Sequence, residues 1–276
     1  MKDKLSNLKN MMWAAAILLC LLAMLVGLIF AMSRKNSETR ADGTITLGQI
    51  ERTKKAKDSD IAGMETAVKT LTPLPESTKG NLESVFNMTF LCDKTIMGIK
   101  TYATNYGDGI IPQIWTDDGS GLPAKNAAEN PIVFVDGSQI TPANAAMVTR
   151  PKTVVIYLGG DGLAETSEQE FIDGYTGLIQ SLRSASPSTN VVVCSIASIS
   201  SNYQGGDGLT PALISRANNW IRQICVDTGV YFADLASFLN DDNGYLSDAY
   251  LMPDGRSVAA AGIALIVDYF RFHGLS

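Results

Sequence analysis

Three short stretches of the chain place charged and polar side chains next to an apolar segment. They are Cys92-Asp93-Lys94-Thr95, Gly159-Gly160-Asp161-Gly162 and Pro253-Asp254-Gly255-Arg256-Ser257. The first two follow predicted strands, and ligands of open α/β sheets bind at the carboxyl ends of the strands. The third precedes the last predicted helix and can fold over the same edge. The sequence therefore predicts one polar site made from all three stretches.

Lys94 could either act as a catalytic residue or stand in a position where a catalytic residue has been lost. A lysine with a depressed pKa can act as a base, but nearby carboxylates favour its charged form, and a charged amine is no base. An unpaired buried ammonium also destabilises a fold strongly. We therefore predict that Lys94 forms an ion pair or triad with Asp161 and Asp254.

Other chemistries are less well supported by the same residues. Asp93, Asp161 and Asp254 could together bind a divalent cation. Lys94 would compete for the same space, so no metal is predicted. Gly160-x-Gly162-x-x-Glu165 lacks the third glycine of a dinucleotide fingerprint, so no cofactor is predicted. The chain has four cysteines and no Cys-x-x-Cys pair, which argues against zinc and thioredoxin patterns and predicts buried, unpaired thiols.

Short apolar runs along the chain predict the strands that position this site. They are residues 85–91, 131–135, 153–159, 190–196 and 230–233. Nearly continuous apolarity is typical of strands buried on both faces of a parallel sheet.

Helix starts lie between these runs. Thr141-Pro142 and Thr210-Pro211 place a cap before proline, and Ser167 with Glu170 forms a capping box. The last helix is predicted over Arg256 to Phe272. The alternation predicts an α/β fold, a three-layer α/β/α sandwich with a parallel sheet.

The N-terminal part predicts a membrane anchor. Residues 11–32 contain no charged side chain, and 22 residues at about 1.5 Å each span about 33 Å, enough to cross a hydrocarbon core of ~30 Å. A cleaved signal peptide is the alternative, but its apolar core usually has only about 7–15 residues. Positive charges flank both sides, so the short N-terminus, rather than charge, favours an N-inside orientation.

The predicted organisation has four parts. Residues 1–10 form a short cytoplasmic N-terminus, 11–32 a single transmembrane helix, 33–79 a partly helical stalk and 80–276 an extracytoplasmic domain. The net charge of −6 argues against nucleic acid as a partner, because nucleic-acid binding needs a basic face.

The three stretches, in this order, resemble the motif blocks of the SGNH/GDSL hydrolases, extracytoplasmic esterases and acylhydrolases with a flavodoxin-like fold. Cys92-Asp93-Lys94 with Gly98 resembles the Gly-Asp-Ser block, and Asp254-x-x-Ser257 with Gly262 resembles the Asp-x-x-His block. Gly159-Gly160-Asp161-Gly162 resembles the block that ends a strand in glycine and carries an asparagine. The resemblance covers about residues 84–274.

The resemblance also implies which functions are replaced. The nucleophilic serine falls on Lys94, the oxyanion-hole asparagine on Asp161 and the general-base histidine on Ser257, while Asp254 keeps its type. The single histidine, His273, lies 16 residues beyond Ser257, at the far end of the last predicted helix. Ester hydrolysis by a serine needs a base within hydrogen-bond reach, and an ionised Asp161 would repel the developing oxyanion.

We therefore predict a membrane-anchored SGNH-hydrolase-like domain of a bacterial cell envelope that binds or scaffolds without hydrolysis. The resemblance implies an envelope glycan or an acylated molecule as ligand. The alternative is an active esterase, acylhydrolase or carbohydrate O-deacetylase with an unconventional site of Lys94, Thr95 and Asp254. No oligomeric state is predicted.

Overall fold

The computed structural model describes residues 70–77, 80, 85, 87–105 and 113–275. The predicted cytoplasmic N-terminus, the membrane helix and most of the stalk lie outside the described residues. Among the residues described, no helix combines the length and the apolar character needed to cross a bilayer.

A six-stranded parallel sheet forms the centre of the fold, in the order β1-β8-β7-β6-β2-β3. Every residue of β2 and β6 is buried, which explains why these strands are apolar without alternation. The strands span Thr72–Pro73 (β1), Met88–Cys92 (β2), Gln113–Trp115 (β3), Thr153–Tyr157 (β6), Asn190–Cys194 (β7) and Tyr231–Ala233 (β8). The predicted α/β fold with a parallel sheet is confirmed.

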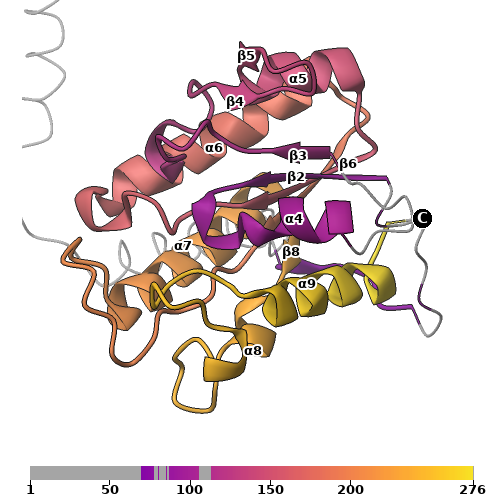
Figure 1. Cartoon of the computed structure of the whole chain (residues 1–276). Helices are drawn as coiled ribbons and strands as arrows, with labels where there is room; N and C mark the ends of the chain where they lie inside the picture. Colours follow the sequence, from indigo (N-terminus) through magenta and orange to yellow (C-terminus); the bar gives the residue numbers. More distant parts are fainter. Residues whose placement is uncertain (1–69, 78–79, 81–84, 86, 106–112, 276) are drawn as a thin grey trace, which may run out of the picture. The chain divides into compact units, whose positions relative to one another are not determined.

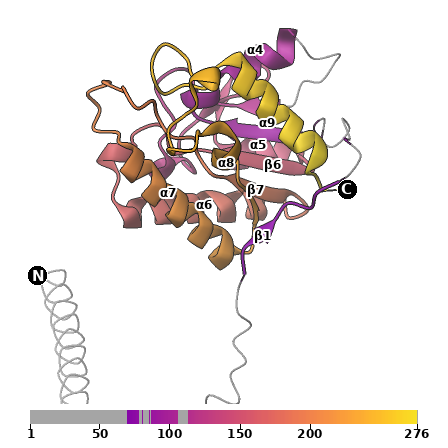
Figure 2. The ribbon, with the colours of Figure 1, turned by 90° about the horizontal axis from the view of Figure 1, so that it is seen from below.

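Helices lie on both faces of this sheet (Figures 1 and 2). On one side α6 packs between α5 and α7, and on the other α9 packs against α4 and α8. The helices span Gly98–Asn105 (α4), Pro142–Thr149 (α5), Glu168–Ala185 (α6), Pro211–Thr228 (α7), Ala236–Leu239 (α8) and Ala260–Phe272 (α9). The 3-10 turns span Lys94–Ile96 (η1), Ala124–Asn126 (η2), Leu163–Glu165 (η3) and Asp248–Tyr250 (η4).

The predicted helix starts are confirmed by their caps. The Thr141 and Thr210 side chains accept the third backbone N–H of α5 and α7, and proline follows each. Ser167 and Glu170 form both halves of the capping box of α6. The described cysteines, Cys92, Cys194 and Cys225, are buried and unpaired, as predicted.

Two predicted elements differ from the structure. The run 131–135 is not a strand of the main sheet, because only Ile132–Val133 (β4) is extended and it pairs antiparallel with Gln139–Ile140 (β5) in a separate sheet. Asp136 and Gly137, the latter with φ of 83°, turn the chain back directly after β4. The last helix begins at Ala260, not Arg256, because the residues before it form a turn.

The predicted domain start at residue 80 is also too late. Thr72–Pro73 pairs in parallel with Tyr231 and Phe232 of β8, so the sheet begins within the segment predicted as stalk. A two-residue strand containing proline has no apolar periodicity to reveal it, and proline is tolerated because β1 lies at the edge of the sheet.

Two glycines of α6 provide a matched test of helix packing. A Cβ at Gly174 would clash with the Ala124 carbonyl oxygen, whereas a Cβ at Gly177 meets nothing within 4 Å. We expect Gly174→Ala to lower the free energy of unfolding by about 2 kcal/mol, because backbone must move to make room. Gly177→Ala should raise it by about 0.5–1 kcal/mol, since alanine favours the helix. Urea unfolding of the two variants checks both signs, and a stabilising Gly174→Ala would contradict the close approach.

Candidate functional site

The site lies where the chain leaves β2 and β6. Asp93 follows β2 and caps η1, which carries Lys94 and Thr95, and the stretch Gly159-Gly160-Asp161 follows β6. The Val258 amide donates to the Thr95 carbonyl oxygen at 2.8 Å, which brings the 254–257 stretch against η1. The structure therefore gathers all three predicted stretches at one edge.

Asp93 connects two of these stretches from a fully buried position, with no exposed surface. Its Oδ1 accepts the Thr95 amide at 3.0 Å and the Thr95 hydroxyl at 2.5 Å. Its Oδ2 accepts the amides of Gly159 at 3.0 Å and Gly160 at 2.7 Å. Burial first, and then the charge of Asp161, raise the pKa of Asp93, while hydrogen bonds from Thr95 and Gly160 lower it in part. Asp93 thus orders the turns after β2 and β6.

Lys94 and Asp161 form the predicted ion pair, with 3.0 Å between Lys94 Nζ and Asp161 Oδ1. The lysine side chain is 49% exposed and that of the aspartate only 4%. Asp161 Oδ2 also accepts the Leu122 amide at 3.3 Å. The predicted triad is not formed, because Asp254 makes no ion pair with any described cation. Its carboxylate is instead held by backbone and hydroxyl donors.

Arg256 completes the network around Asp161, although the sequence analysis gave it no role. Its Nη2 lies 3.0 Å from Asp161 Oδ1 and donates to the Gly160 carbonyl oxygen at 2.8 Å. Its Nη1 lies 3.0 Å from Asp207 Oδ2, which also accepts the Tyr203 hydroxyl at 2.8 Å. Burial opposes the charge of Arg256, but the Tyr203 hydroxyl and Asp161 outweigh it and raise the pKa of the guanidinium. Arg256 therefore joins three loops at the strand ends.

Asp254 and Ser257 hold the turn before α9. Ser257 donates from its hydroxyl to Asp254 Oδ2 at 2.5 Å and from its amide to Oδ1 at 2.9 Å. The Arg256 amide donates to the same Oδ1 at 3.1 Å. Burial raises the pKa of Asp254, but the hydrogen bonds from Ser257 outweigh it and the net pKa is lowered, so this carboxylate is ionised at neutral pH.

A second loop, after β3, faces Asp161 and was not assigned a role from the sequence. The buried Asp117 carboxylate accepts the amides of Gly119 and Gly121 and so folds the loop. Gly121 and Leu122 then approach Asp161, whose Oδ2 would lie 3.6 Å from a Cβ at Gly121. The sequence signal was Asp-Asp-Gly-Ser-Gly, a composition typical of side-chain-stabilised turns.

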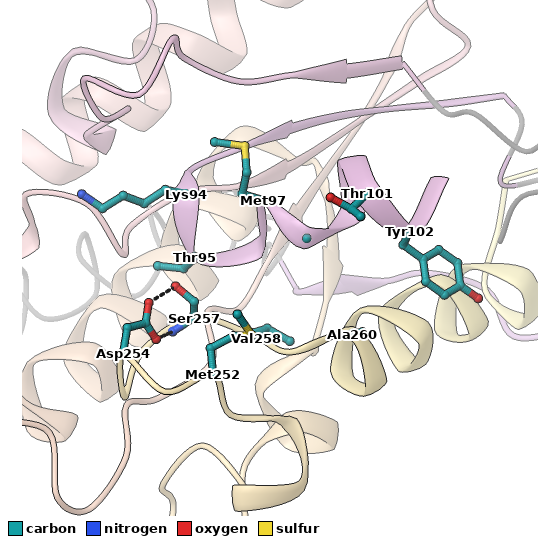
Figure 3. A pocket seen from close by; sticks show the side chains of 11 residues that line it. Lys94, Thr95, Met97, Thr101, Tyr102, Met252, Asp254, Ser257, Val258 and Ala260 are labelled. Carbon is teal, nitrogen blue, oxygen red and sulfur yellow. Dashed lines mark hydrogen bonds between the residues drawn. The ribbon is translucent and has the colours of Figure 1, made fainter. Parts of the chain in front are cut away.

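A cavity of about 400 Å³ lies beside the site (Figure 3). One of its sides is formed by η1 and α4, and the other by the residues that precede and begin α9. Its polar lining is Lys94, Thr95, Thr101, Asp254 and Ser257, and its remaining walls are Met97, Gly98, Tyr102, Met252, Val258 and Ala260. The Ser257 hydroxyl points to Asp254 in this view, as the dashed lines mark. Three of the predicted site residues, Lys94, Asp254 and Ser257, thus border a space large enough for a small organic molecule, whereas Asp161 is not part of its lining.

Among the residues that the structure describes, no histidine lies beside the hydroxyl groups of the site. His273 is at the far end of α9, where its ring stacks on Tyr269 with centroids 4.1 Å apart and Nδ1 lies 2.9 Å from the Tyr269 carbonyl oxygen. The Thr95 hydroxyl is bound to Asp93. In the part of the chain that the structure describes, no cluster of three or more metal-binding His, Cys, Asp or Glu side chains occurs.

The two cations on Asp161 are expected to differ in their contribution to stability. Lys94→Met should lower the free energy of unfolding by no more than about 1 kcal/mol, because the lysine is half exposed. Arg256→Met should lower it by about 2 kcal/mol, since it leaves the buried Asp161 carboxylate and the partly buried Gly160 carbonyl oxygen with fewer donors. Urea unfolding of both variants measures the difference, and a larger effect of Lys94→Met would contradict this ranking.

Comparisons with known proteins identify the family. The model of the GDSL-like lipase/acylhydrolase family matches residues 124–263, a span that contains Asp161, Asp254 and Ser257 but not Lys94. A comparison with curated proteins finds no match.

Similar solved structures include a GDSL-like lipase from Bacteroides thetaiotaomicron, with 12% identity, TM-score 0.49 and coverage of 67% of this chain and 85% of that one. A carbohydrate esterase family 3 protein from Talaromyces cellulolyticus has 18% identity and TM-score 0.48, with coverage of 67% of this chain and 93% of that one. The periplasmic domain of a Salmonella Paratyphi A lipopolysaccharide acetyltransferase has 15% identity and TM-score 0.45, with coverage of 68% of this chain and 82% of that one. With just over half of its length matched by the family model, the chain belongs to the GDSL-like lipase/acylhydrolase family, the SGNH hydrolases.

Proposed function

We propose that this SGNH-hydrolase domain binds a ligand at its sheet edge without hydrolysing esters. The observation that carries this proposal is the ion pair between Lys94 and Asp161, which lies where the family resemblance puts the nucleophile and an oxyanion-hole donor. A charged amine held by a carboxylate can neither attack an ester carbonyl nor accept a proton. The pair replaces two catalytic functions at once.

The electrostatics of the site support the same proposal. An oxyanion hole needs donors directed at the place where negative charge develops. Here the available donors contact the carboxylate of Asp161, which the protein itself supplies. These donors are Lys94, Arg256 and the Leu122 amide. A substrate oxyanion would have to displace Asp161 or lie beside its charge, and either raises the barrier to reaction.

The proposal includes a location for the domain, outside the cytoplasm and anchored to the membrane. An uncharged segment at residues 11–32 of sufficient length supports a single-pass membrane anchor with the domain on the extracytoplasmic side. The family supplies the ligand classes, which are an acylated molecule or a glycan of the cell envelope. Alkaline phosphatase fused after Ser276 should be active in bacteria if this orientation is right, and inactive if the domain is cytoplasmic.

Hydrolysis is tested directly on the full chain in mild detergent. We expect no release of p-nitrophenol from p-nitrophenyl acetate above the rate of heat-unfolded protein, and no adduct with a serine-directed fluorophosphonate. The rival hypothesis, an unconventional esterase, predicts turnover that Lys94→Ala or Asp254→Ala abolishes while the exposed Asp242→Ala leaves it intact. Such a pattern would overturn the binding proposal.

A further inference from the structure

The charges that line the cavity beside the site are not balanced. Lys94 lies on one side with its amine bound to Asp161, and Figure 3 shows the amine turned away from Met97 and Tyr102. Asp254 lies on the same lining with its side chain exposed and forms no ion pair with a described cation. The nearby Arg256 guanidinium is engaged by Asp161 and Asp207. The unbalanced charge of the lining is therefore negative.

Asp254 also has unused hydrogen-bonding capacity. A carboxylate offers about four lone-pair positions. Two donors, the amides of Arg256 and Ser257, occupy Oδ1, whereas Oδ2 receives only the Ser257 hydroxyl. An N–H donor from a ligand can bind Oδ2 without displacing any of these contacts.

The rest of the lining is apolar. Met97, Met252 and Val258 contribute thioether and aliphatic surface, and Tyr102 contributes an aromatic wall. Met252 lines the cavity and is 44% exposed, so part of its apolar surface is open to a ligand. At about 400 Å³ the cavity lies in the lower part of the range for small-molecule sites, about 300–1,000 Å³. The space therefore fits a compact ligand with an apolar body.

We propose that this cavity binds a small organic ammonium ion, whose N–H groups donate to Asp254 Oδ2 and whose apolar substituent lies against Met97, Met252 and Val258. The inference rests on the proposed function, because the ligand is bound and not converted. It adds a positive charge to the requirements on a ligand, which the proposed function alone does not specify. An anionic ligand fits less well, since it would approach the charge of Asp254 while Lys94 is held by Asp161.

The proposal is tested with four probes on the full chain in dodecyl maltoside, by saturation-transfer NMR at neutral pH. Benzylammonium carries both features, benzyl alcohol lacks the charge, benzoate reverses it and methylammonium lacks the apolar group. We expect benzylammonium to bind at least ~10-fold more tightly than each of the others, as a charge-assisted hydrogen bond combined with apolar contact predicts. Empty micelles give the background.

Two variants and a control assign the site. Asp254→Asn should weaken benzylammonium binding by ~10-fold or more, and Asp242→Asn, which removes a charge from an exposed turn outside the cavity lining, should not change it. Met252→Gln should weaken benzylammonium but not methylammonium, and thermal unfolding verifies that each variant is folded.

The outcomes separate the two proposals. Equal binding of benzylammonium and benzyl alcohol, tighter binding of benzoate, or no effect of Asp254→Asn overturns the ammonium site and leaves the absence of hydrolysis untouched. Ester turnover in the assay above overturns the proposed function, whether or not ammonium ions bind.

Discussion

Asp93→Asn is expected to lower the free energy of unfolding by about 4 kcal/mol. The amide replaces one of two carboxylate oxygens, and each of those oxygens accepts two donors from Thr95, Gly159 and Gly160. Two donors would then face an NH2 group in a fully buried position, at about 1–3 kcal/mol each. For a domain of this size the melting temperature should fall by roughly 10 °C.

Asp136 provides a matched control for this substitution. Its carboxylate also accepts the amide and the hydroxyl of the residue two positions later, Ser138, at 2.9 and 2.6 Å, but it is exposed and contacts no other strand end. Asp136→Asn should therefore change the free energy of unfolding by less than about 1 kcal/mol. Equal effects of the two substitutions in urea unfolding would show that the link between the β2 and β6 turns contributes little.

Parts of the fold with strong local signals could be predicted from the sequence. The buried strands β2, β6, β7 and β8 are continuous apolar runs, and the capped starts of α5, α6 and α7 satisfy backbone donors that only a helix start leaves free. The edge strands β1 and β3 are short and partly exposed, so they carry no such pattern. The run at 131–135 is apolar like the central strands, and its hairpin could be recognised only from the turn that follows.

The site was predictable to the extent that its residues follow strands. Lys94 and Asp161 were placed together because the carboxyl ends of neighbouring parallel strands meet, and β2 does pair with β6. Arg256 was missed since its partners, Asp161 and Asp207, are 95 and 49 positions away in the chain. Asp117 was missed for a different reason, because its contacts are local and resemble those of any surface turn.

These misses change the physical interpretation of Asp161. From the sequence, its carboxylate was expected to neutralise one lysine. The structure gives it two cations and a backbone amide, an arrangement that would equally suit an external anion. Under the proposed function Asp161 is an internal anion at the place of a substrate oxyanion, and its negative charge is the feature that opposes oxyanion stabilisation most directly.

If the resemblance places the catalytic positions correctly, combined substitution of Lys94, Asp161 and Ser257 by the residues of the family is expected to produce ester hydrolysis. The variant Lys94→Ser, Asp161→Asn, Ser257→His should hydrolyse p-nitrophenyl acetate at least ~100-fold faster than the wild type, the lower end of what a positioned general base contributes. Residue 257 already donates to Asp254, so a histidine there has its orienting carboxylate.

The other two changes remove the obstacles to reaction. Asp161→Asn would offer an amide donor in place of a charge, and Arg256 would keep Asp207 and the Gly160 carbonyl as partners. The matched control is Lys94→Ala with the same two other changes, which supplies the base and the donor but no nucleophile. If both triple variants are folded and hydrolyse the ester at the same rate, position 94 does not face the carbonyl and the placement of the nucleophile is wrong. A rate that depends on the hydroxyl at 94, and that falls again on adding Asp254→Asn, would instead mean that three side chains alone separate this domain from a working hydrolase.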